Sequence, residues 1–274
     1  MTRVSIIGPV LNEAQFIGFS IMSMLEHAHE FVYALDAKSS DGTRELLQYI
    51  KEKYAHEKLV ILEHPTFHPL EMDKYNEAFN RCIRESSGDA IAFIHPDMIC
   101  TKWADPKEGP LAWWTNVTSY AKDLKTVITK GRCDKWKNIH AKRFGVHYAG
   151  AYGSQNEDFY HSAITGKAYK HYGTDFAKYP FEVTDSGIDL AHYCELKPYK
   201  RRLEKMKLCL KTQTGSKDEA FIDDLATNHP RVTLEQSSNR FGQFEFTESA
   251  NPIPEVFTKY EQEFSQFKKE PVCA

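Results

Sequence analysis

The first 100 residues alternate between short apolar runs and segments with helical periodicity. The apolar runs are residues 4–10, 31–35, 59–62 and 90–94, and the helical patterns between them are residues 16–27, 43–54 and 71–86. Short runs that are apolar throughout are typical of strands buried on both faces of a sheet. Strands that alternate with helices form a mainly parallel sheet with helices on both faces. The sequence therefore predicts an α/β fold of this kind.

Two aspartates follow predicted strands. Asp36 comes directly after the second apolar run, and Asp97 comes shortly after the fourth. Because crossovers between parallel strands are right-handed, the carboxyl ends of these strands lie at one edge of the sheet. Ligands of such sheets bind outside that edge. We therefore expect Asp36 and Asp97 to lie at a common binding site.

The pattern becomes weaker after residue 100. Four tryptophans lie among polar residues, which favours loops and short helices over a second core: Trp103, Trp113, Trp114 and Trp136. Further strands are predicted at residues 148–152 and 188–193, and helices at residues 198–211 and 219–225. The residues from 248 onward contain three prolines and are expected to run over the surface. This part of the chain is thus predicted to be an irregular C-terminal region.

Charge and cysteine spacing argue against several classes of protein. The net charge is −3, so no overall positive field attracts nucleic acid or a membrane surface. The six cysteines lie far apart without a C-x-x-C pair, which is typical of reduced thiols in a cytosol. No stretch approaches the roughly 18 apolar residues that a membrane-spanning helix needs. We therefore expect a cytoplasmic protein without a transmembrane segment.

Several motifs occur in a fixed order within residues 4–99. VSIIGPVLNE spans the first predicted strand and the turn after it, and ALDAKSSDGT spans the second. Asn80, Gly88-Asp89 and His95-Pro96-Asp97 follow. This ordered set resembles the opening half of the family 2 glycosyltransferases, which have the GT-A fold. The resemblance implies an inverting enzyme that moves a sugar from a nucleotide-sugar donor, which we expect to be a UDP-sugar, to a hydroxyl acceptor.

The resemblance also implies a set of donor-binding residues. Asp36 is expected to accept a hydrogen bond from the base, as a carboxylate at a sheet edge can. The other residues that the family motifs place around the nucleotide are Pro9, Asn12, Glu13, Asn80 and His95. A purely structural interpretation stays open for this region, in which Asp36 opens a turn and Asp41 caps the helix that begins near Thr43.

A divalent metal, Mn²⁺ or Mg²⁺, is the cofactor that the resemblance implies. Asp97 matches the last carboxylate of the family's D-x-D segment, which binds a metal that bridges the two phosphates. His95 stands where the first aspartate of that segment usually lies. His192 resembles a histidine that completes the metal site in some members, and imidazole suits manganese. A satisfied, partly buried histidine is the alternative interpretation of His192.

Basic residues follow His192 closely. Lys197, Lys200, Arg201 and Arg202 begin a run that continues into the predicted helix at residues 198–211. Such a run is usually a solvated helix face. Directly after a predicted metal ligand it can instead clamp a diphosphate, and we assign Arg201 and Arg202 to the donor site on that ground.

An inverting transfer needs one carboxylate that deprotonates the acceptor hydroxyl. Four residues are considered for this role: Glu157, Asp158, Asp185 and Asp189. The usual distance along the chain from D-x-D favours Asp185 or Asp189. In a strand, Asp189 would point away from His192, because one position is odd and the other even. Asp185 is therefore preferred, with Asp189 and Asp158 as the other choices.

The resemblance also divides the chain. Residues 1–100 are expected to form the nucleotide-sugar-binding half of a GT-A domain, and residues 101–215 the half that binds the acceptor and completes the metal site. Residues 216–274 are expected to be a helical and tail extension. The expected acceptor is a saccharide or lipopolysaccharide, with a modified nucleic-acid base as the second choice, because tryptophans near lysines can stack on either.

Two other functions stay open. The first is a catalytically decayed nucleotide-sugar-binding protein, because His95 replaces an aspartate of the family motif. The second is a sugar-nucleotide nucleotidyltransferase, although the turn after the first strand, PVLNEAQF, contains no Arg or Lys. P-loop and dinucleotide-binding glycine motifs do not follow any predicted strand, which argues against those chemistries.

Overall fold

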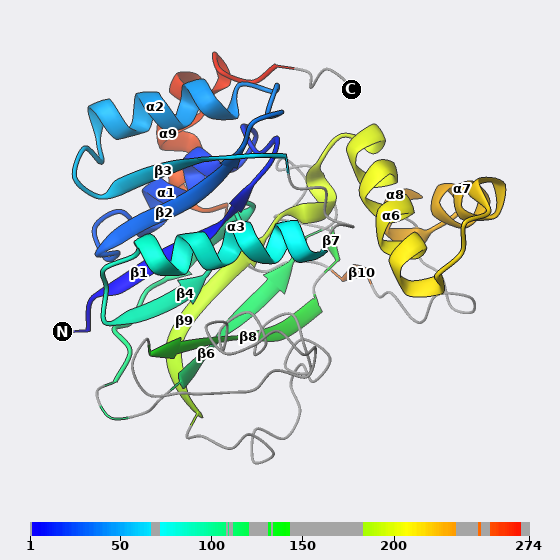
Figure 1. Cartoon of the computed structure of the whole chain (residues 1–274). Helices are drawn as coiled ribbons and strands as arrows, with labels where there is room; N and C mark the ends of the chain where they lie inside the picture. The colour runs from blue at the N-terminus through cyan, green and yellow to red at the C-terminus, as the bar shows by residue number, and fades with distance from the viewer. Residues whose placement is uncertain are drawn as a thin grey trace.

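The computed structural model describes most of both ends of the chain and parts of its middle. The described residues are 2–66, 72–107, 109, 112–120, 131–132, 134–142, 183–233, 246–247 and 253–269. Figure 1 shows these residues as a sheet flanked by helices, with a separate group of helices beside it.

One mixed sheet organises the described residues. Its strands are β1 (Val4–Val10), β2 (Glu30–Asp36), β3 (Leu59–His64), β4 (Ala90–Phe93), β5 (Met98–Lys102), β6 (Ala112–Ser119), β8 (Asp134–Lys142) and β9 (Val183–His192). Their order across the sheet is β3-β2-β1-β4-β8-β6-β9-β5. The first four neighbours are parallel, as are β6 and β9, whereas β8 and β5 pair antiparallel with their neighbours. The predicted, mainly parallel sheet is therefore confirmed.

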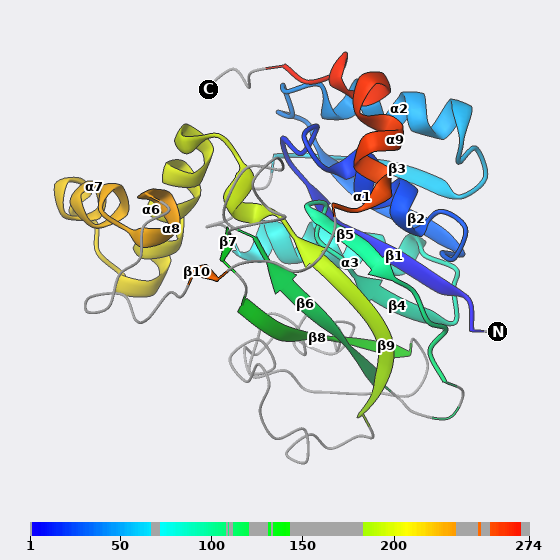
Figure 2. The ribbon, with the colours of Figure 1, turned by 180° about the vertical axis from the view of Figure 1, so that it is seen from behind.

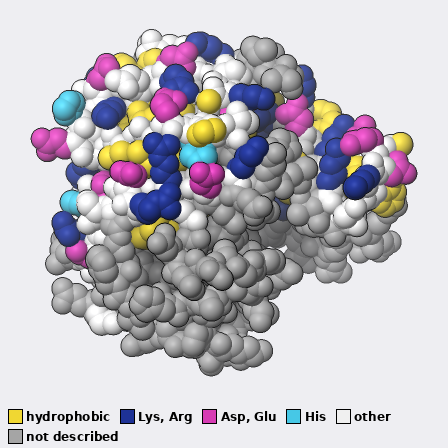
Figure 3. Space-filling view, in the orientation of Figure 1, with side chains coloured by type: hydrophobic (Ala, Val, Ile, Leu, Met, Phe, Trp, Pro, Cys, Tyr) yellow, Lys and Arg dark blue, Asp and Glu magenta, His cyan; other side chains and the backbone are white. Residues whose placement is uncertain are grey.

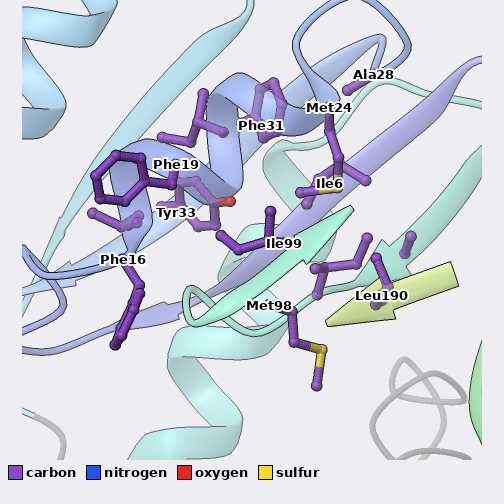
Figure 4. Close-up of a cluster of buried hydrophobic side chains, with 14 of the residues drawn as sticks. Ile6, Phe16, Phe19, Met24, Ala28, Phe31, Tyr33, Met98, Ile99 and Leu190 are labelled. Carbon is purple, nitrogen blue, oxygen red and sulfur yellow. The ribbon is translucent and has the colours of Figure 1, made fainter. Parts of the chain in front are cut away.

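Helices cover both faces of this sheet. On one face lie α1 (Ile17–Met24), α2 (Thr43–Lys53) and α9 (Glu255–Ser265), and on the other lies α3 (Met72–Glu85). Neighbouring residues of β1 divide between the two cores, since Ile6 packs with α1 and Ile7 packs with α3. Figure 4 shows part of the larger core, in which Phe16 and Phe19 lie against residues of β2 and β5. Apolar residues at successive positions are thus what a strand buried on both faces requires.

Three of the four tryptophans after residue 100 correct the sequence prediction. Trp113 and Trp114 lie in β6, and Trp136 lies in β8, so they belong to strands of the main sheet rather than to loops. Trp113 is 1% exposed, and buried positions alternate along β6 with half-buried ones such as Asn116. Polar residues at the alternate positions hid this strand. The strand predicted at residues 148–152 lies outside the described residues.

The chain after β9 forms a group of helices and contributes one strand to a second, two-stranded sheet. After a short 3₁₀ turn (η2, Cys194–Leu196), the helices α6 (Tyr199–Thr214), α7 (Glu219–Thr227) and α8 (Pro230–Thr233) pack together beside the sheet. A further short pair joins β7 (Gly131–Arg132) to β10 (Phe246–Thr247).

The helix α9 near the C-terminus is part of the core, contrary to the expected surface course. Figure 2 shows α9 lying along α1 on the back of the sheet. Phe257 and Phe264 of α9 are 3% and 0% exposed, because they pack against Phe16 and Phe19. The apolar spacing within α9 outweighed the prolines on which the prediction rested. Within the described residues, no helix has the length and hydrophobicity to cross a membrane.

Candidate functional site

A cavity of about 490 Å³ opens at the carboxyl end of β1 and after β4. The sheet edge contributes one wall, α3 contributes Tyr75, and α6 contributes the opposite wall. The lining residues are Pro9, Leu11, Glu13, Tyr75, His95, Pro96, Asp97, Lys197, Arg201, Glu204, Lys205, Leu208 and Cys209. The cavity therefore lies at the edge where ligands of parallel sheets bind.

Strand pairing brings Asp97 and His192 together. Met98 of β5 lies opposite His192 of β9, and the Tyr193 amide donates to the Asp97 carbonyl at 2.9 Å. The His192 Nε2 atom lies 3.2 Å from Asp97 Oδ1. Both side chains are buried, at 7% and 2% exposure. Two residues from distant parts of the sequence thus form one polar pair beside the cavity.

Lys197 joins this pair to the loop after β1. Its ammonium lies 2.9 Å from Asp97 Oδ2 and 2.6 and 2.7 Å from the two carboxylate oxygens of Glu13. Lys197 is itself 7% exposed. A buried ammonium with two carboxylate partners is electrostatically compensated, as buried charges need to be.

The loop after β1 is held by the turn after β2. Asn12 has a left-handed backbone with φ of 54°, and its side-chain oxygen accepts the Ser40 amide at 2.8 Å. The Glu13 amide donates to Thr43 Oγ1 at 2.7 Å, and the Ala14 amide donates to Asp41 at 3.0 Å. The two turns that carry the sequence motifs thus form one hydrogen-bonded unit.

Burial and neighbouring charges set the protonation of this cluster. Burial raises the pKa of Glu13, although Lys197 opposes the rise. Burial would also raise the pKa of Asp97, but Lys197 and His192 hold that pKa well below its usual value. Burial lowers the pKa of His192, and nearby Cys194 and Asp97 outweigh it and raise that pKa to about 10. Asp97 is therefore ionised at neutral pH.

The family comparison agrees with the motifs at this edge. Residues 5–107 match the family model of glycosyl transferase family 2. This stretch of the chain is similar to that family. The match assigns it to the enzymes that transfer glycosyl groups, and it includes β1 to β5 with Glu13 and Asp97. No curated protein matches the chain.

Solved glycosyltransferases give weaker matches over most of the chain. TarS from S. aureus is 13% identical, with 84% of this chain and 70% of that chain covered and a TM-score of 0.36. The mannosyltransferase PcManGT from Pyrobaculum calidifontis, solved with GDP-Man and Mn²⁺, is 13% identical, with 85% and 73% covered and a TM-score of 0.41. Glucosyl-3-phosphoglycerate synthase from Mycobacterium tuberculosis, solved with Mn²⁺ and UDP-glucose, is 14% identical, with 94% and 91% covered and a TM-score of 0.39.

Asp36 lies at the end of β2 and is completely buried. Its Oδ1 atom accepts the Lys38 amide at 2.7 Å, which is the contact of a turn-opening aspartate. Asp41 accepts the amide of Thr43, the first residue of α2, at 3.1 Å. Both carboxylates thus have structural contacts, and base recognition by Asp36 stays a prediction.

Two further donor-site predictions differ in their placement. His95 lines the cavity, with its ring centroid 5.8 Å from that of His192, and burial lowers its pKa to about 3. It is therefore a neutral imidazole at physiological pH. Asn80 is half-buried on α3, outside the residues that line the cavity.

The two arginines of α6 point to different places. Arg201 lines the cavity, and its Nη2 atom donates to the Asn12 carbonyl at 3.1 Å. Arg202 instead donates to the Val232 carbonyl at 3.0 Å and to the Lys197 carbonyl. Consecutive residues of a helix point about 100° apart, so the two arginine side chains leave α6 in different directions. The structure places Arg201 at the predicted site and Arg202 in the contact between α6 and α8.

The outer part of the basic run is paired with acidic residues. Lys207 lies 2.8 Å from Asp223, and Lys211 lies 2.6 Å from Glu219, both on α7. Figure 3 shows basic and acidic side chains intermixed on this group of helices. This end of α6 is therefore a charge-balanced, solvated face.

Of the carboxylates considered as general base, two lie away from the cavity beside Asp97 and two lie outside the described residues. Asp185 is exposed and accepts the Gly187 amide at 2.7 Å. Asp189 accepts a hydrogen bond from Asn116 at 3.0 Å and lines a second cavity, of about 880 Å³, beside β5, β6 and the start of α9. Asp158 and Glu157 lie outside the described residues. The structure thus does not bring Asp185 or Asp189 to Asp97.

Two features of the site were missed or misjudged from the sequence. Lys197 was grouped with residues around the diphosphate, whereas its ammonium is taken up by Glu13 and Asp97. Gly88-Asp89 lies away from the cavity, where the Gly88 amide donates to Ser5 and Asp89 pairs with Arg3. A single lysine between two distant acidic motifs has no local signal, because only the folded chain brings the three together.

Proposed function

We propose that this chain is an inverting glycosyltransferase that moves a sugar from a UDP-sugar to a hydroxyl group of a saccharide acceptor. The observation that carries the proposal is the convergence of Glu13 and Asp97 at the cavity on the sheet edge, with His192 in contact with Asp97. The family match supports sugar transfer as the class of reaction. Inversion, the donor base and the acceptor are our extensions of it.

Asp97 and His192 can together hold a divalent metal once the imidazole has given up its proton, as metal binding requires of a histidine ligand. Neighbouring ligands of an octahedral ion with bonds near 2.1 Å lie about 3 Å apart, and Asp97 Oδ1 and His192 Nε2 lie 3.2 Å apart. Mn²⁺ and Mg²⁺ commonly use one or two protein ligands and complete their shell with phosphates and water. Two protein ligands would therefore be enough here, where the described residues contain no group of three or more His, Cys, Asp and Glu side chains suited to a metal. When bound, such an ion offsets the charge of the departing diphosphate.

The remaining cavity residues supply fixed charges for the donor. Arg201 and Lys205 lie on the α6 wall, across from Pro9 and His95 of the sheet edge. Their cations can donate hydrogen bonds to the diphosphate oxygens, and Arg201 can do so with the planar geometry that suits phosphate. Arg201 is held by the Asn12 carbonyl, so its position is set before the donor arrives. This preorganisation lowers the cost of ordering the site.

A donor screen tests the proposal. The purified chain is incubated with UDP- and GDP-sugars, with Mn²⁺ and with a chelator, and release of the nucleoside diphosphate is measured. We expect release from a UDP-sugar that depends on Mn²⁺. Binding of the nucleotide sugar without release or transfer, with saccharide acceptors present, would identify a decayed donor-binding protein instead.

The stereochemistry of the product is a second measurement. An inverting enzyme gives the opposite anomer to that of the donor sugar, and proton NMR of the first product distinguishes the two. The general base of this step stays a prediction among Asp185, Asp189 and Asp158. Because the structure places the first two outside the Asp97 cavity, Asp158→Asn is the informative variant.

A further inference from the structure

All three N–H donors of the Lys197 ammonium have an oxygen of Glu13 or Asp97 within reach. An ammonium group has three N–H donors, and Lys197 has three oxygen contacts, two from Glu13 and one from Asp97, at 2.6, 2.7 and 2.9 Å. The side chain is buried, so water does not compete strongly for these donors. Lys197 is thus a link between two motifs rather than a free cation for a ligand.

The segment that carries Lys197 grips the loop after β1 at three places. Gln15 donates to the Leu196 carbonyl at 3.3 Å, Lys197 contacts Glu13, and Arg201 donates to the Asn12 carbonyl at 3.1 Å. Arg202 donates to the Lys197 carbonyl and fixes its backbone from the other side. The ammonium is therefore held in place by its own chain as well as by its partners.

The two oxygens of Asp97 have different neighbours because of this contact. Oδ2 lies against Lys197, and Oδ1 is turned toward His192. Rotation of the carboxylate would break the contact with a buried ammonium, which is costly. We propose that Lys197 is a positioning residue, which fixes the rotation of Asp97 and so directs Oδ1 toward His192 while it ties Glu13 to the same point. The catalytic consequence rests on the proposed function, whereas the effect on His192 does not.

Charge balance gives the same residue a second task. Glu13 and Asp97 are two carboxylates beside one cavity, and each has Lys197 as a partner. Without the ammonium, the two would repel each other, and both would lack the partner that compensates for burial. Loss of Lys197 therefore disturbs both acidic motifs together, whereas loss of Glu13 leaves Lys197 and Asp97 paired.

The test compares four variants with the wild-type chain. Lys197→Met removes the ammonium and keeps most of the volume, Lys197→Arg keeps a cation, and Glu13→Gln removes one acidic partner. Lys207→Met is the matched control, because Lys207 lies on α6, the helix that follows Lys197, but pairs with Asp223 outside the cavity. The first readout is the nitrogen NMR spectrum of the His192 imidazole in metal-free protein, with thermal melting to check the fold.

We expect Lys197→Met to shift the His192 ring resonances, Lys197→Arg to shift them less, and Lys207→Met to leave them unchanged. Glu13→Gln should give a smaller shift than Lys197→Met, and it serves as the test if Lys197→Met does not fold. Unchanged His192 resonances in folded Lys197→Met would overturn the proposal. If only Glu13→Gln folds, unchanged resonances in that variant would do so.

The second readout is steady-state kinetics on the donor. Lys197→Met should lower kcat about tenfold or more with a smaller change in donor KM, as expected for geometry that matters most in the transition state. Equal kcat values in Lys197→Met and Lys207→Met would contradict the catalytic part. A wild-type chain without any transfer would instead refute the proposed function, while the His192 spectra would still decide the role of Lys197.

Discussion

His192 Nε2 lies 3.2 Å from Asp97 Oδ1, although the two residues are far apart in the sequence. The pairing of β5 with β9 places them there, since Met98 and His192 are direct partners in that ladder. The contact therefore depends on β9, which lies outside the residues 5–107 that match the family model. Its chemical consequences can be tested one residue at a time.

Asp97→Asn should abolish transfer and leave the fold intact. The amide keeps the shape of the side chain but removes the charge that a divalent metal needs, while Lys197 retains Glu13 as its partner. We expect turnover to fall by about three orders of magnitude or more, as for loss of an essential electrostatic contact. Turnover and thermal melting are measured together. Asp89→Asn is the control, because Asp89 pairs with Arg3 away from the cavity.

Full activity of the wild-type chain in a chelating buffer would contradict the metal part of this prediction. Loss of activity in Asp97→Asn with a much lower melting temperature would show a structural effect instead.

Asp36→Asn separates the two interpretations of that residue. Asparagine keeps an oxygen that can accept the Lys38 amide, so the turn survives, but it removes the charge expected to bind the donor base. Base recognition is nearly equal in the ground and transition states, so donor KM should rise more than kcat falls. Loss of one charged hydrogen bond corresponds to about 1.5–3 kcal/mol. An unchanged donor KM across UDP- and GDP-sugars would leave Asp36 as a turn-forming residue only.

The N-terminal half was predictable because its signals are local. Every residue of β1 is buried, so the strand is visible as a nearly continuous apolar run. The loop residues Asn12 and Asp41 belong to motifs that each begin in a predicted strand and continue into the turn after it. Convergence of Asp97 with the end of β1 then follows from the handedness of parallel crossovers.

The C-terminal half was less predictable because pairing partners determine it. Asn116 and Thr118 of β6 are polar and half-buried, so the strand reads as a polar stretch until β8 and β9 are placed on either side. The role of Lys197 depends on two contacts across the fold, and a basic run by itself only suggests a solvated face or a phosphate clamp. Likewise, the rotation between Arg201 and Arg202 matters only once the cavity is located.

His140 should make the stability of the protein depend on pH. It is completely buried in β8 beside Trp113, and burial lowers its pKa to about 3. The unfolded chain protonates this histidine below about pH 6.5, whereas the folded chain keeps it neutral. The unfolded state therefore binds more protons, and stability falls as pH decreases from 6.5 toward 3.

Between pH 7 and pH 5 this single group should cost about 2 kcal/mol of unfolding free energy. Denaturant titrations at the two pH values measure the loss, and His140→Gln should reduce it because glutamine does not titrate. An equal pH dependence in the variant and the wild type would show that His140 does not carry the effect.

Gly42→Ala tests whether the segment after α9 braces the turn that holds the loop after β1. Gly42 has φ of 93°, and an added Cβ would overlap with the backbone carbonyl of Phe267. Gly215 is the matched control, because it also has a positive φ, of 66°, but no atom lies within 4 Å of an added Cβ.

Gly215→Ala should therefore lower the free energy of unfolding only by the cost of the left-handed backbone, about 1–2 kcal/mol. Gly42→Ala should lose about 1–3 kcal/mol more from the overlap, because the backbone of residue 267 must move. Denaturant unfolding of both variants measures the difference, and hydrogen exchange of the Lys269 amide, which donates to the Asp41 carbonyl at 2.8 Å, reports where it arises. If the two variants lost equal stability, the close approach of the Phe267 backbone to Gly42 would not brace the turn.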